Sequence, residues 1–267
     1  MNVARDRIKI GASGEGIERL EAMLHGNAFS PHRHDSYAIG ITVAGVQTFR
    51  FRGAKWHCLP GQCHILHPDE LHDGGAGTDE PFGYRMLYID PSLVQQALRG
   101  QPLPFVPNPV LDPTGLLDGE GSELWDINGK VDEITRTELS VLVANLLVGA
   151  APGGTRAGVR SLDIKALLRV REFIAAYPSQ IHSMKELEVL AGLDRWTIAR
   201  QFRAAFGTSP SRFRTQRQLD HVRDLIRGGS SLVDASIKAG FADQSHMSRQ
   251  FKSTYGLTPA KWASAIL

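Results

Sequence analysis

The stretch that decides the fold of the carboxyl-terminal half is Ala239-Gly-Phe-Ala-Asp-Gln-Ser-His-Met-Ser-Arg-Gln-Phe-Lys-Ser-Thr-Tyr-Gly-Leu-Thr-Pro259. It repeats an earlier segment of the same chain at an offset of 48 or 49 residues. The matched pairs are Ala191-Gly192-Leu193 with Ala239-Gly240-Phe241, Gln201-Phe202-Arg203 with Gln250-Phe251-Lys252, Phe206-Gly207 with Tyr255-Gly256, Pro210 with Pro259, and Phe213 with Trp262. An internal repeat of this kind indicates two copies of one supersecondary unit.

Each copy has the sequence signals of a helix, a tight turn and a second helix. In the first copy, Ser183-Met-Lys-Glu186 forms a capping box that starts a helix, and Gly192 suits the left-handed residue that ends it. Asp194 can cap the following helix. The corresponding residues of the second copy are Ser231, Asp234, Gly240 and Asp243. The pattern predicts two helix-turn-helix motifs, with longer helices at 162–177 and 210–227 beside them.

Charge divides the chain in two. Residues 1–152 hold 12 Lys and Arg against 19 Asp and Glu, whereas residues 153–267 hold 18 against 9. Because the basic part contains the repeat, it is the part expected to meet a polyanion. The intervening Gly149-Ala-Ala-Pro-Gly-Gly-Thr-Arg-Ala-Gly158 offers few side chains for a core. We therefore predict an acidic N-terminal domain at 1–150, a flexible linker at 151–160 and a nucleic-acid-binding domain at 161–267.

The second helix of each copy contains the candidate DNA contacts. Ile198 and Phe202, like Met247 and Phe251, are four residues apart and would face the core. The exposed face and start of each helix then present side chains that hydrogen-bond base edges or phosphates. These candidates are Arg195, Trp196, Arg200, Arg203, Gln244, Ser245, His246, Arg249 and Lys252. Arg203 and Lys252, near the helix ends, are expected to contact phosphate. The alternative is that these charges only solvate a small helical bundle.

Residues 183–267 resemble the DNA-binding domain of the AraC/XylS family of bacterial transcription regulators, and 239–259 is close to that family's signature. The resemblance implies seven helices, with the helix at 210–227 holding two recognition helices on one face of the DNA. They would enter successive major grooves about one helical turn (~34 Å) apart. The resemblance also implies activation through contact with RNA polymerase. Ala199 stands where some relatives have a longer polar side chain.

From Ser30 to Asp90 the hydrophobic period shortens to two, with frequent turns, which predicts a sandwich or barrel. Pro31-His-Arg-His-Asp35, Pro60-Gly61 and Pro68-Asp-Glu-Leu-His72 resemble the cupin jelly-roll. More narrowly, residues 28–92 resemble the arabinose-binding-like sensor domain that precedes such DNA-binding domains. The expected fold class is therefore α+β, with an N-terminal β-barrel and covering helices followed by an all-α domain with two helix-turn-helix motifs.

Seven of the ten histidines lie between His25 and His72. His32 and His34, two apart on a predicted strand, would point the same way and could share a metal with His72. Metal-binding cupins add a glutamate four residues after the second histidine, where this chain has Ala38. Three roles stay open for the histidines: metal ligands, effector contacts together with Tyr84, or structural hydrogen bonds. We expect no resident metal or other cofactor, and an effector whose identity the sequence does not give.

Residues 132–148 are predicted to form a helix with a wide apolar stripe. The stripe consists of Ile134, Leu139, Leu142, Val143, Leu146 and Leu147. Such a helix can pack on two surfaces, and the family resemblance implies a dimer contact here, so we predict a homodimer through 132–148. The alternative is a helix that only covers the barrel.

No apolar run approaches the ~18 residues that cross a bilayer, and the N-terminus lacks the apolar core of a secretory signal. The two cysteines, Cys58 and Cys63, cannot form a disulfide framework. These features predict a cytoplasmic protein without membrane contact.

Together these observations predict a sequence-specific DNA-binding transcription regulator, an activator rather than a repressor and not an enzyme. A small molecule in the N-terminal barrel would control it, and RNA polymerase and duplex DNA would be its partners. The competing hypothesis is a metal-dependent cupin enzyme with a helical appendage. Ala38 argues against it, as does the lack of a Ser/His/Asp set or a Gly-rich phosphate loop at useful spacing.

Overall fold

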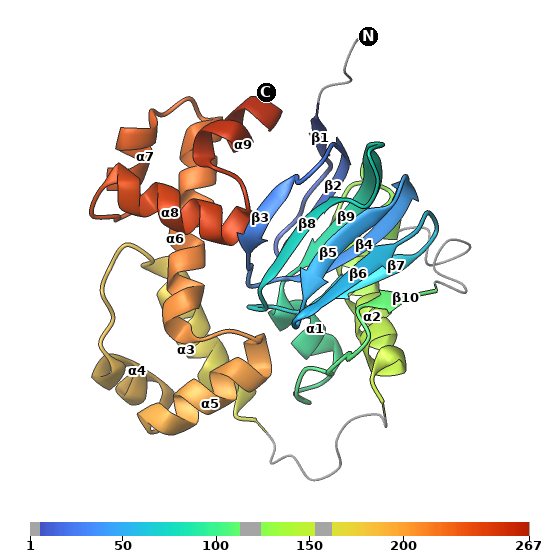
Figure 1. The fold of residues 1–267 in the computed structure, drawn as a ribbon. Coiled ribbons are helices and arrows are strands. Elements are labelled where there is room, and N and C mark those ends of the chain that lie inside the picture. Colours follow the sequence, from blue (N-terminus) through green and yellow to red (C-terminus); the bar gives the residue numbers. More distant parts are fainter. Residues whose placement is uncertain (1–5, 113–123, 153–161, 267) are drawn as a thin grey trace.

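The computed structural model describes residues 6–112, 124–152 and 162–266, a strand-rich part followed by a helical part (Figure 1). The strands are β1 (Arg7–Ile10), β2 (Ile17–Leu24), β3 (Phe29–His32), β4 (Tyr37–Ala44), β5 (Gln47–Phe51), β6 (Ala54–Cys58), β7 (Cys63–Leu66), β8 (His72–Ala76), β9 (Phe82–Ile89) and β10 (Val110–Leu111). Helices α1 (Pro91–Ala97) and α2 (Glu133–Ala150) complete this part. The α+β class predicted from the sequence is confirmed.

The strands form two antiparallel sheets, one in the order β1-β2-β9-β4-β7-β10 and the other in the order β3-β8-β5-β6. Residues on the two faces of β4 alternate between two cores. Ile39 packs with α2 on the outer face, whereas Ala38 belongs to the inner core between the sheets. Because the strands divide between two sheets, closure into a barrel stays a prediction.

Helix α2 packs one stripe onto the outer face of the six-stranded sheet. Leu139, Val143 and Leu147 are buried there together with residues of β4 and β9. Ile134 and Val141 of the same helix are exposed. The covering role that the sequence allowed for this helix is therefore present, and its role in a dimer stays a prediction.

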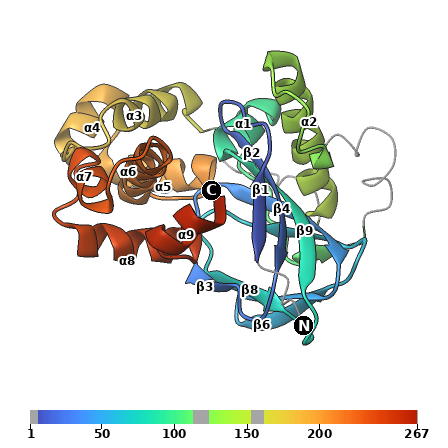
Figure 2. The same cartoon turned by 90° about the horizontal axis from the view of Figure 1, so that it is seen from above.

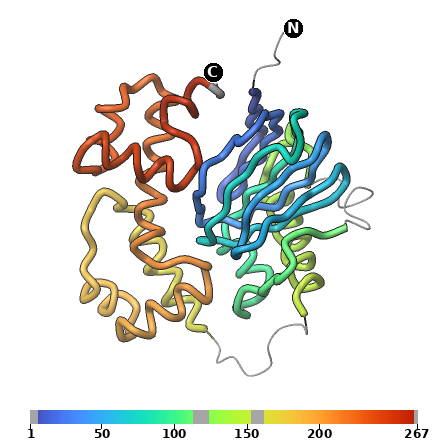
Figure 3. Tube along the Cα trace, viewed as in Figure 1, coloured from blue at the N-terminus to red at the C-terminus, as the bar shows by residue number. Residues whose placement is uncertain are grey.

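The helical part consists of α3 (Ile164–Ala176), α4 (Met184–Ala191), α5 (Arg195–Phe206), α6 (Pro210–Arg227), α7 (Leu232–Lys238), α8 (Gln244–Tyr255) and α9 (Pro259–Ile266). The predicted caps are present: Ser183 and Glu186 form the capping box, and Asp194 and Asp243 cap α5 and α8. Helix α6 joins two separate cores, contributing Phe213 to one and Leu219 with Val222 to the other. In the trace of Figure 3, α6 runs from the group formed by α3, α4 and α5 to the group formed by α7, α8 and α9.

The two parts lie side by side (Figure 2). Helix α8 contacts β3, α9 contacts β1, and α5 contacts α1. Most of the predicted linker at 151–160 falls outside the described residues, so the predicted domain boundaries stay predictions. Within the described residues, no helix combines the length and the hydropathy that crossing a bilayer requires.

Candidate DNA-binding helices and an interdomain cavity

The predicted DNA-contact residues of α5 and α8 lie at the surface, while the predicted inward stripes are buried. Ile198 and Phe202 of α5 are fully buried, and Trp196 is 75% exposed. The other candidates are exposed as well, apart from His246, which is half-buried beside the ring of Phe241. The exposed candidates are Arg195, Arg200, Arg203, Gln244, Ser245, Arg249 and Lys252. The helix surfaces are therefore accessible to DNA, and the individual contacts stay predictions.

Two of the cationic candidates on α5 have carboxylate neighbours. Arg195 donates from Nε to Glu188 Oε1 at 3.0 Å, within the same helix-turn-helix. The guanidinium of Arg203 lies 3.8 Å from Asp69, which belongs to the strand-rich part and also forms an ion pair with Arg212 of α6. Arg203, which is predicted to contact phosphate, thus already lies next to the acidic side chain of Asp69 in the strand-rich part.

The carboxyl-terminal ends of both candidate recognition helices contact the strand-rich part. Gly207 ends α5 with φ +73°, and a β-carbon there would lie 2.6 Å from Pro68 Cβ. Its repeat partner Gly256 ends α8 with φ +70°, and a β-carbon there would lie 2.9 Å from His32 Nδ1. The backbones also join, because Arg33 N donates to Ser253 O at 3.0 Å. Such close approach is possible because glycine has no side chain.

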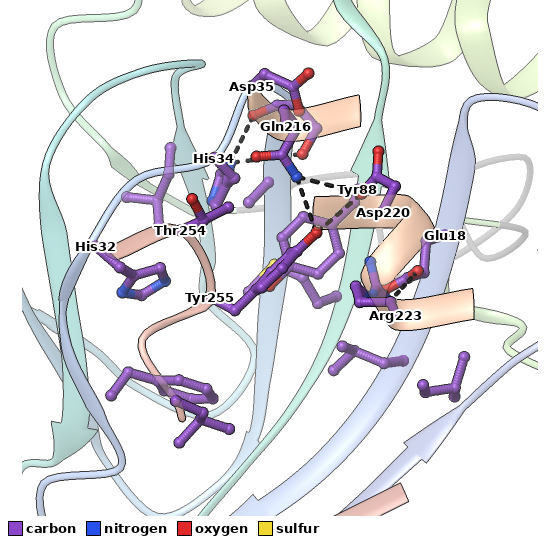
Figure 4. Close-up of a pocket in the computed structure, with 18 of the residues that line it drawn as sticks. Glu18, His32, His34, Asp35, Tyr88, Gln216, Asp220, Arg223, Thr254 and Tyr255 are labelled. Carbon is purple, nitrogen blue, oxygen red and sulfur yellow. Dashed lines mark hydrogen bonds and ion pairs between the residues drawn. The ribbon is translucent and has the colours of Figure 1, made fainter. Parts of the chain in front are cut away.

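A cavity of about 470 Å³ lies between the two sheets and continues to the helical part. Figure 4 shows its two walls: Glu18, His34 and Tyr88 come from the strand-rich part, and Gln216, Arg223 and Tyr255 come from α6 and α8. Clefts of this size between domains are typical small-molecule sites.

Ion pairs cross the boundary at the cavity. Arg223 donates to Glu18 at 2.6 Å, and Arg217 donates to Asp35 at 2.8 Å. Burial raises the pKa of Asp35 to about 6, against the opposing effect of Arg217. Arg171 of α3 forms a further ion pair with Asp90, just before α1. The two parts are thus connected by partly buried ion pairs around the cavity.

The predicted effector-contact residues meet in this cavity. His34 lies two residues beyond the end of β3 rather than on it, which corrects the expectation that both histidines share a strand. The rings nevertheless cluster: the centroid of His72 is 4.3 Å from that of His32 and 4.8 Å from that of His34. Tyr84 lines the same cavity, and burial raises its pKa. Burial also lowers the pKa of His32 to about 4 and that of His34 to about 3.

The residues do not fit a cupin metal centre. Ala38 is buried inside the sandwich, where metal-binding cupins place a glutamate ligand. Across the part of the chain that the structure describes, no group of three or more His, Cys, Asp or Glu is arranged to hold a metal ion. No chemical step is therefore assigned to a metal here.

Several residues of the cavity wall were not predicted from the sequence. Glu18, Asp35, Arg217 and Arg223 come from segments far apart in the chain, and single charges on strands or helices carry no local sign of pairing. His64 is one of the seven histidines between His25 and His72, but the sequence predicts no role for it. It is fully buried on the cavity wall, and both of its ring nitrogens are without hydrogen-bond partners in the described structure.

Comparison with known proteins agrees with this architecture. A profile of the AraC-like ligand-binding domain matches residues 15–121, and a helix-turn-helix domain profile matches residues 189–265. The chain is 24% identical to the HTH-type transcriptional activator RhaS of Escherichia coli (strain K12 / DH10B), over 92% of each chain. It is 22% identical to the uncharacterized HTH-type transcriptional regulator YbfI of Bacillus subtilis (strain 168), over 82% of this chain and 81% of YbfI.

The chain belongs to the AraC family of transcription regulators. Its fold resembles that of ToxT from Vibrio cholerae, with a TM-score of 0.66 at 11% identity over 94% of this chain and 99% of ToxT. The AraC-family assignment makes the protein a helix-turn-helix DNA-binding regulator with a ligand-binding domain. It favours this function over the cupin enzyme, because these relatives are transcription regulators.

Proposed function

We propose that a small molecule in the interdomain cavity controls how α5 and α8 are presented to DNA, and thereby controls transcription. The observation that supports this most is the composition of the cavity wall, which includes both the sensor strands and the helices of the DNA-binding part. A ligand that fills such a cavity changes the free energy of their contact. By linkage, effector and operator then alter each other's affinity by the same factor.

The DNA contacts are proposed for the exposed faces of α5 and α8. Arg200, Gln244 and Arg249 are proposed to contact base edges, with Trp196, Ser245 and His246 beside them. Arg195, Arg203 and Lys252 are proposed to contact phosphates. One chain would insert the two helices into successive major grooves, because the repeat gives each chain two such helices.

Activation is the proposed direction of control. RhaS is described as a transcriptional activator, and it aligns with nearly the whole chain. We propose contact with RNA polymerase on the same ground. Structures of ToxT with an unsaturated fatty acid or with (E)-4-(8-methylnaphthalen-1-yl)but-3-enoic acid support a small-molecule effector in this fold. The protein is proposed to act in the cytoplasm without catalysing a reaction.

A homodimer through α2 is part of the proposal. The inner stripe of α2 is buried on the sheet, while Ile134 is 69% and Val141 44% exposed on its outer side. Exposed apolar side chains on one helix suit a contact with a second copy. Light scattering after size exclusion tests this directly. Val141→Lys should convert a dimer to a monomer, whereas Val189→Lys, on the exposed surface of α4, should not.

The regulatory proposal is tested with the full chain. Duplexes selected from a random library are compared with shuffled duplexes by fluorescence anisotropy, and we expect a preference of about a thousandfold or more at physiological salt. Metabolites that raise the melting temperature are then added to the DNA titration, and each should shift the DNA affinity. Failure to enrich any duplex would contradict the DNA contacts. A saturating ligand without effect on DNA affinity would contradict the effector role.

A further inference from the structure

The three clustered histidines line the cavity, and each ring has one nitrogen left to accept a hydrogen bond. Nδ1 of each ring lies within hydrogen-bond distance of a backbone carbonyl: 2.9 Å to Ser30 O for His32, 2.8 Å to Ser36 O for His34, and 2.9 Å to Glu70 O for His72. A carbonyl oxygen can only accept, so Nδ1 carries the proton in each ring. In a neutral imidazole, Nε2 is then an acceptor without a proton.

The rings are neutral in the folded protein. Burial is the main reason that the pKa of His32 falls to about 4, that of His34 to about 3, and that of His72 well below the usual value. Nε2 of His34 is buried and has no hydrogen-bond partner in the described structure. A buried acceptor that lacks a donor is costly, so this end of the cavity favours a ligand that donates hydrogen bonds.

The remaining charges of the cavity favour a cation. Among the described residues, six carboxylates line it against three guanidinium groups. The carboxylates belong to Glu18, Asp35, Asp73, Asp90, Asp220 and Asp224. Arg171 does not line the cavity, but it forms an ion pair with Asp90. Counting it, the carboxylates outnumber the guanidinium groups by two.

The three guanidinium groups are already paired. Arg217 lies 2.8 Å from Asp35, Arg223 lies 2.6 Å from Glu18, and Arg227 lies 3.6 Å from Asp224. An acid of the kind bound by ToxT would have to share guanidinium groups that are already paired, with Nε of Arg217 and of Arg223 as the donors left without partners in the described structure, whereas a cation would find carboxylates in excess. Asp73 lines the cavity with these histidines, and its charge acts on the His32 ring.

We propose that the ligand of this cavity is a protonated amine, with its ammonium group among Nε2 of His32, His34 and His72 and near Asp73. The inference rests on the proposed function, in which this cavity holds the effector. An ammonium group supplies three donors, which matches three acceptors. Tyr84 and Tyr88 line the cavity with these histidines, and the ring of Tyr88 lies 5.3 Å from that of His34. Aromatic rings suit both an apolar ligand body and a cation.

Matched probes test the charge of the ligand. We would compare 2-phenylethylamine, 2-phenylethanol and 3-phenylpropionate, and then hexylamine, hexanol and heptanoate, by thermal shift and calorimetry on the full chain. Within each series the apolar body is held constant while the head group is cationic, neutral or anionic. The expected result is saturable binding of an amine, one per chain, at least about tenfold tighter than that of its alcohol. The acid should bind more weakly than both.

Two variants locate the ammonium group. Asp73→Asn removes a charge but keeps the oxygen that accepts from Arg50 N, and it should weaken the amine about tenfold while leaving the alcohol unchanged. Asp79→Asn removes an exposed charge from the same part and is the matched control. His34→Met removes one acceptor at similar volume and should abolish the preference for the amine. If His34→Met fails to fold, the effect of Asp73→Asn on amine binding still tests the placement of the ammonium group.

The outcomes separate this inference from the regulatory proposal. Amine binding that leaves DNA affinity unchanged would support the ligand class and contradict the effector role. Stabilisation by acids or alcohols but by no amine would overturn the inference, even if those ligands changed DNA affinity. Stabilisation by Zn²⁺ or Ni²⁺ that EDTA reverses and His34→Met abolishes would also overturn it. An amine whose binding survives both Asp73→Asn and His34→Met would overturn the placement.

Discussion

Gly256, at the end of α8, lies directly against His32 in the wall of the sensor cavity: a β-carbon on Gly256 would be 2.9 Å from His32 Nδ1. Beside it, Ser30 N donates to Gly256 O at 3.3 Å. Any ligand that moves His32 therefore acts on a residue in contact with a candidate recognition helix. The repeat places Gly207 in the same relation to Pro68, so both helices end on the sensor.

Gly256→Ala should loosen the contact between α8 and β3. The substitution adds a clash with His32 to the strain of a left-handed alanine, which is about 1 kcal/mol. Gly192→Ala is the matched control, because Gly192 ends α4 with φ +68° and no atom lies within 4 Å of its β-carbon position. Both variants should lose stability, but only Gly256→Ala should speed hydrogen exchange of the Ser30 and Arg33 amides, which are bonded to α8. Equal exchange in the two variants would contradict a tight contact at Gly256.

Asp69→Asn should strengthen DNA binding. Asp69 is 5% exposed in its side chain, forms an ion pair with Arg212 and lies 3.8 Å from Arg203. Removing its charge frees Arg203 for phosphate, and each additional phosphate contact steepens the dependence of log affinity on log salt by about 0.9. Anisotropy titrations over a range of salt concentrations measure both effects.

Asp79→Asn provides the control for net charge, because Asp79 is an exposed carboxylate of the same sensor domain. Its salt dependence should equal that of the unmodified protein. If Asp69→Asn binds DNA with the same affinity and the same salt dependence as Asp79→Asn, then Asp69 does not compete with DNA for Arg203.

The helical half could be predicted closely because its signals are local. Helix α6 spans Pro210–Arg227, the range predicted from the sequence. Asp194 and Asp243 cap the helices as predicted, since a cap depends only on residues two or three positions away.

The sensor was harder to predict because its determinants are not local. Strand β2 was missed: Arg19 breaks its apolar alternation, and this arginine is buried by a contact with the distant Gly129. The cavity wall was missed for the same reason, since Glu18 meets Arg223 across 205 residues of chain. The histidine pattern of the sensor was visible, but only the structure shows which ring nitrogen of each histidine bonds to the backbone.

Acidification should destabilise the protein steeply between about pH 6.5 and pH 4. Burial lowers the pKa of His32, His64 and His67 to about 4, while the unfolded chain takes up these protons near pH 6.5. The folded state therefore binds fewer protons in this range, and its free energy of unfolding falls as pH falls, by about 1.4 kcal/mol per pH unit for each histidine. Asp35, whose pKa is raised to about 6, takes up one proton in the folded state over this range and offsets part of the loss of stability.

Urea unfolding at several pH values measures this slope. His64→Leu removes one buried titrating ring and should reduce the slope by about one proton. His57→Leu, which removes a histidine at an exposed position, is the matched control. A free energy of unfolding independent of pH across this range would contradict neutral, buried histidines in the sensor.

Arg249→Ala should cost about 1–3 kcal/mol of binding energy at the best operator and relax base preference at one position. Arg249 is exposed on α8, on the side opposite the buried Met247 and Phe251, so its loss removes the proposed DNA contact without opening the core. Arg50→Ala, which removes an exposed arginine from the sensor, separates this effect from the change in net charge. Anisotropy on the selected duplex and on its single-base variants supplies the measurement. Wild-type affinity in Arg249→Ala, or a loss equal to that in Arg50→Ala, would mean that another surface of α8 faces the DNA.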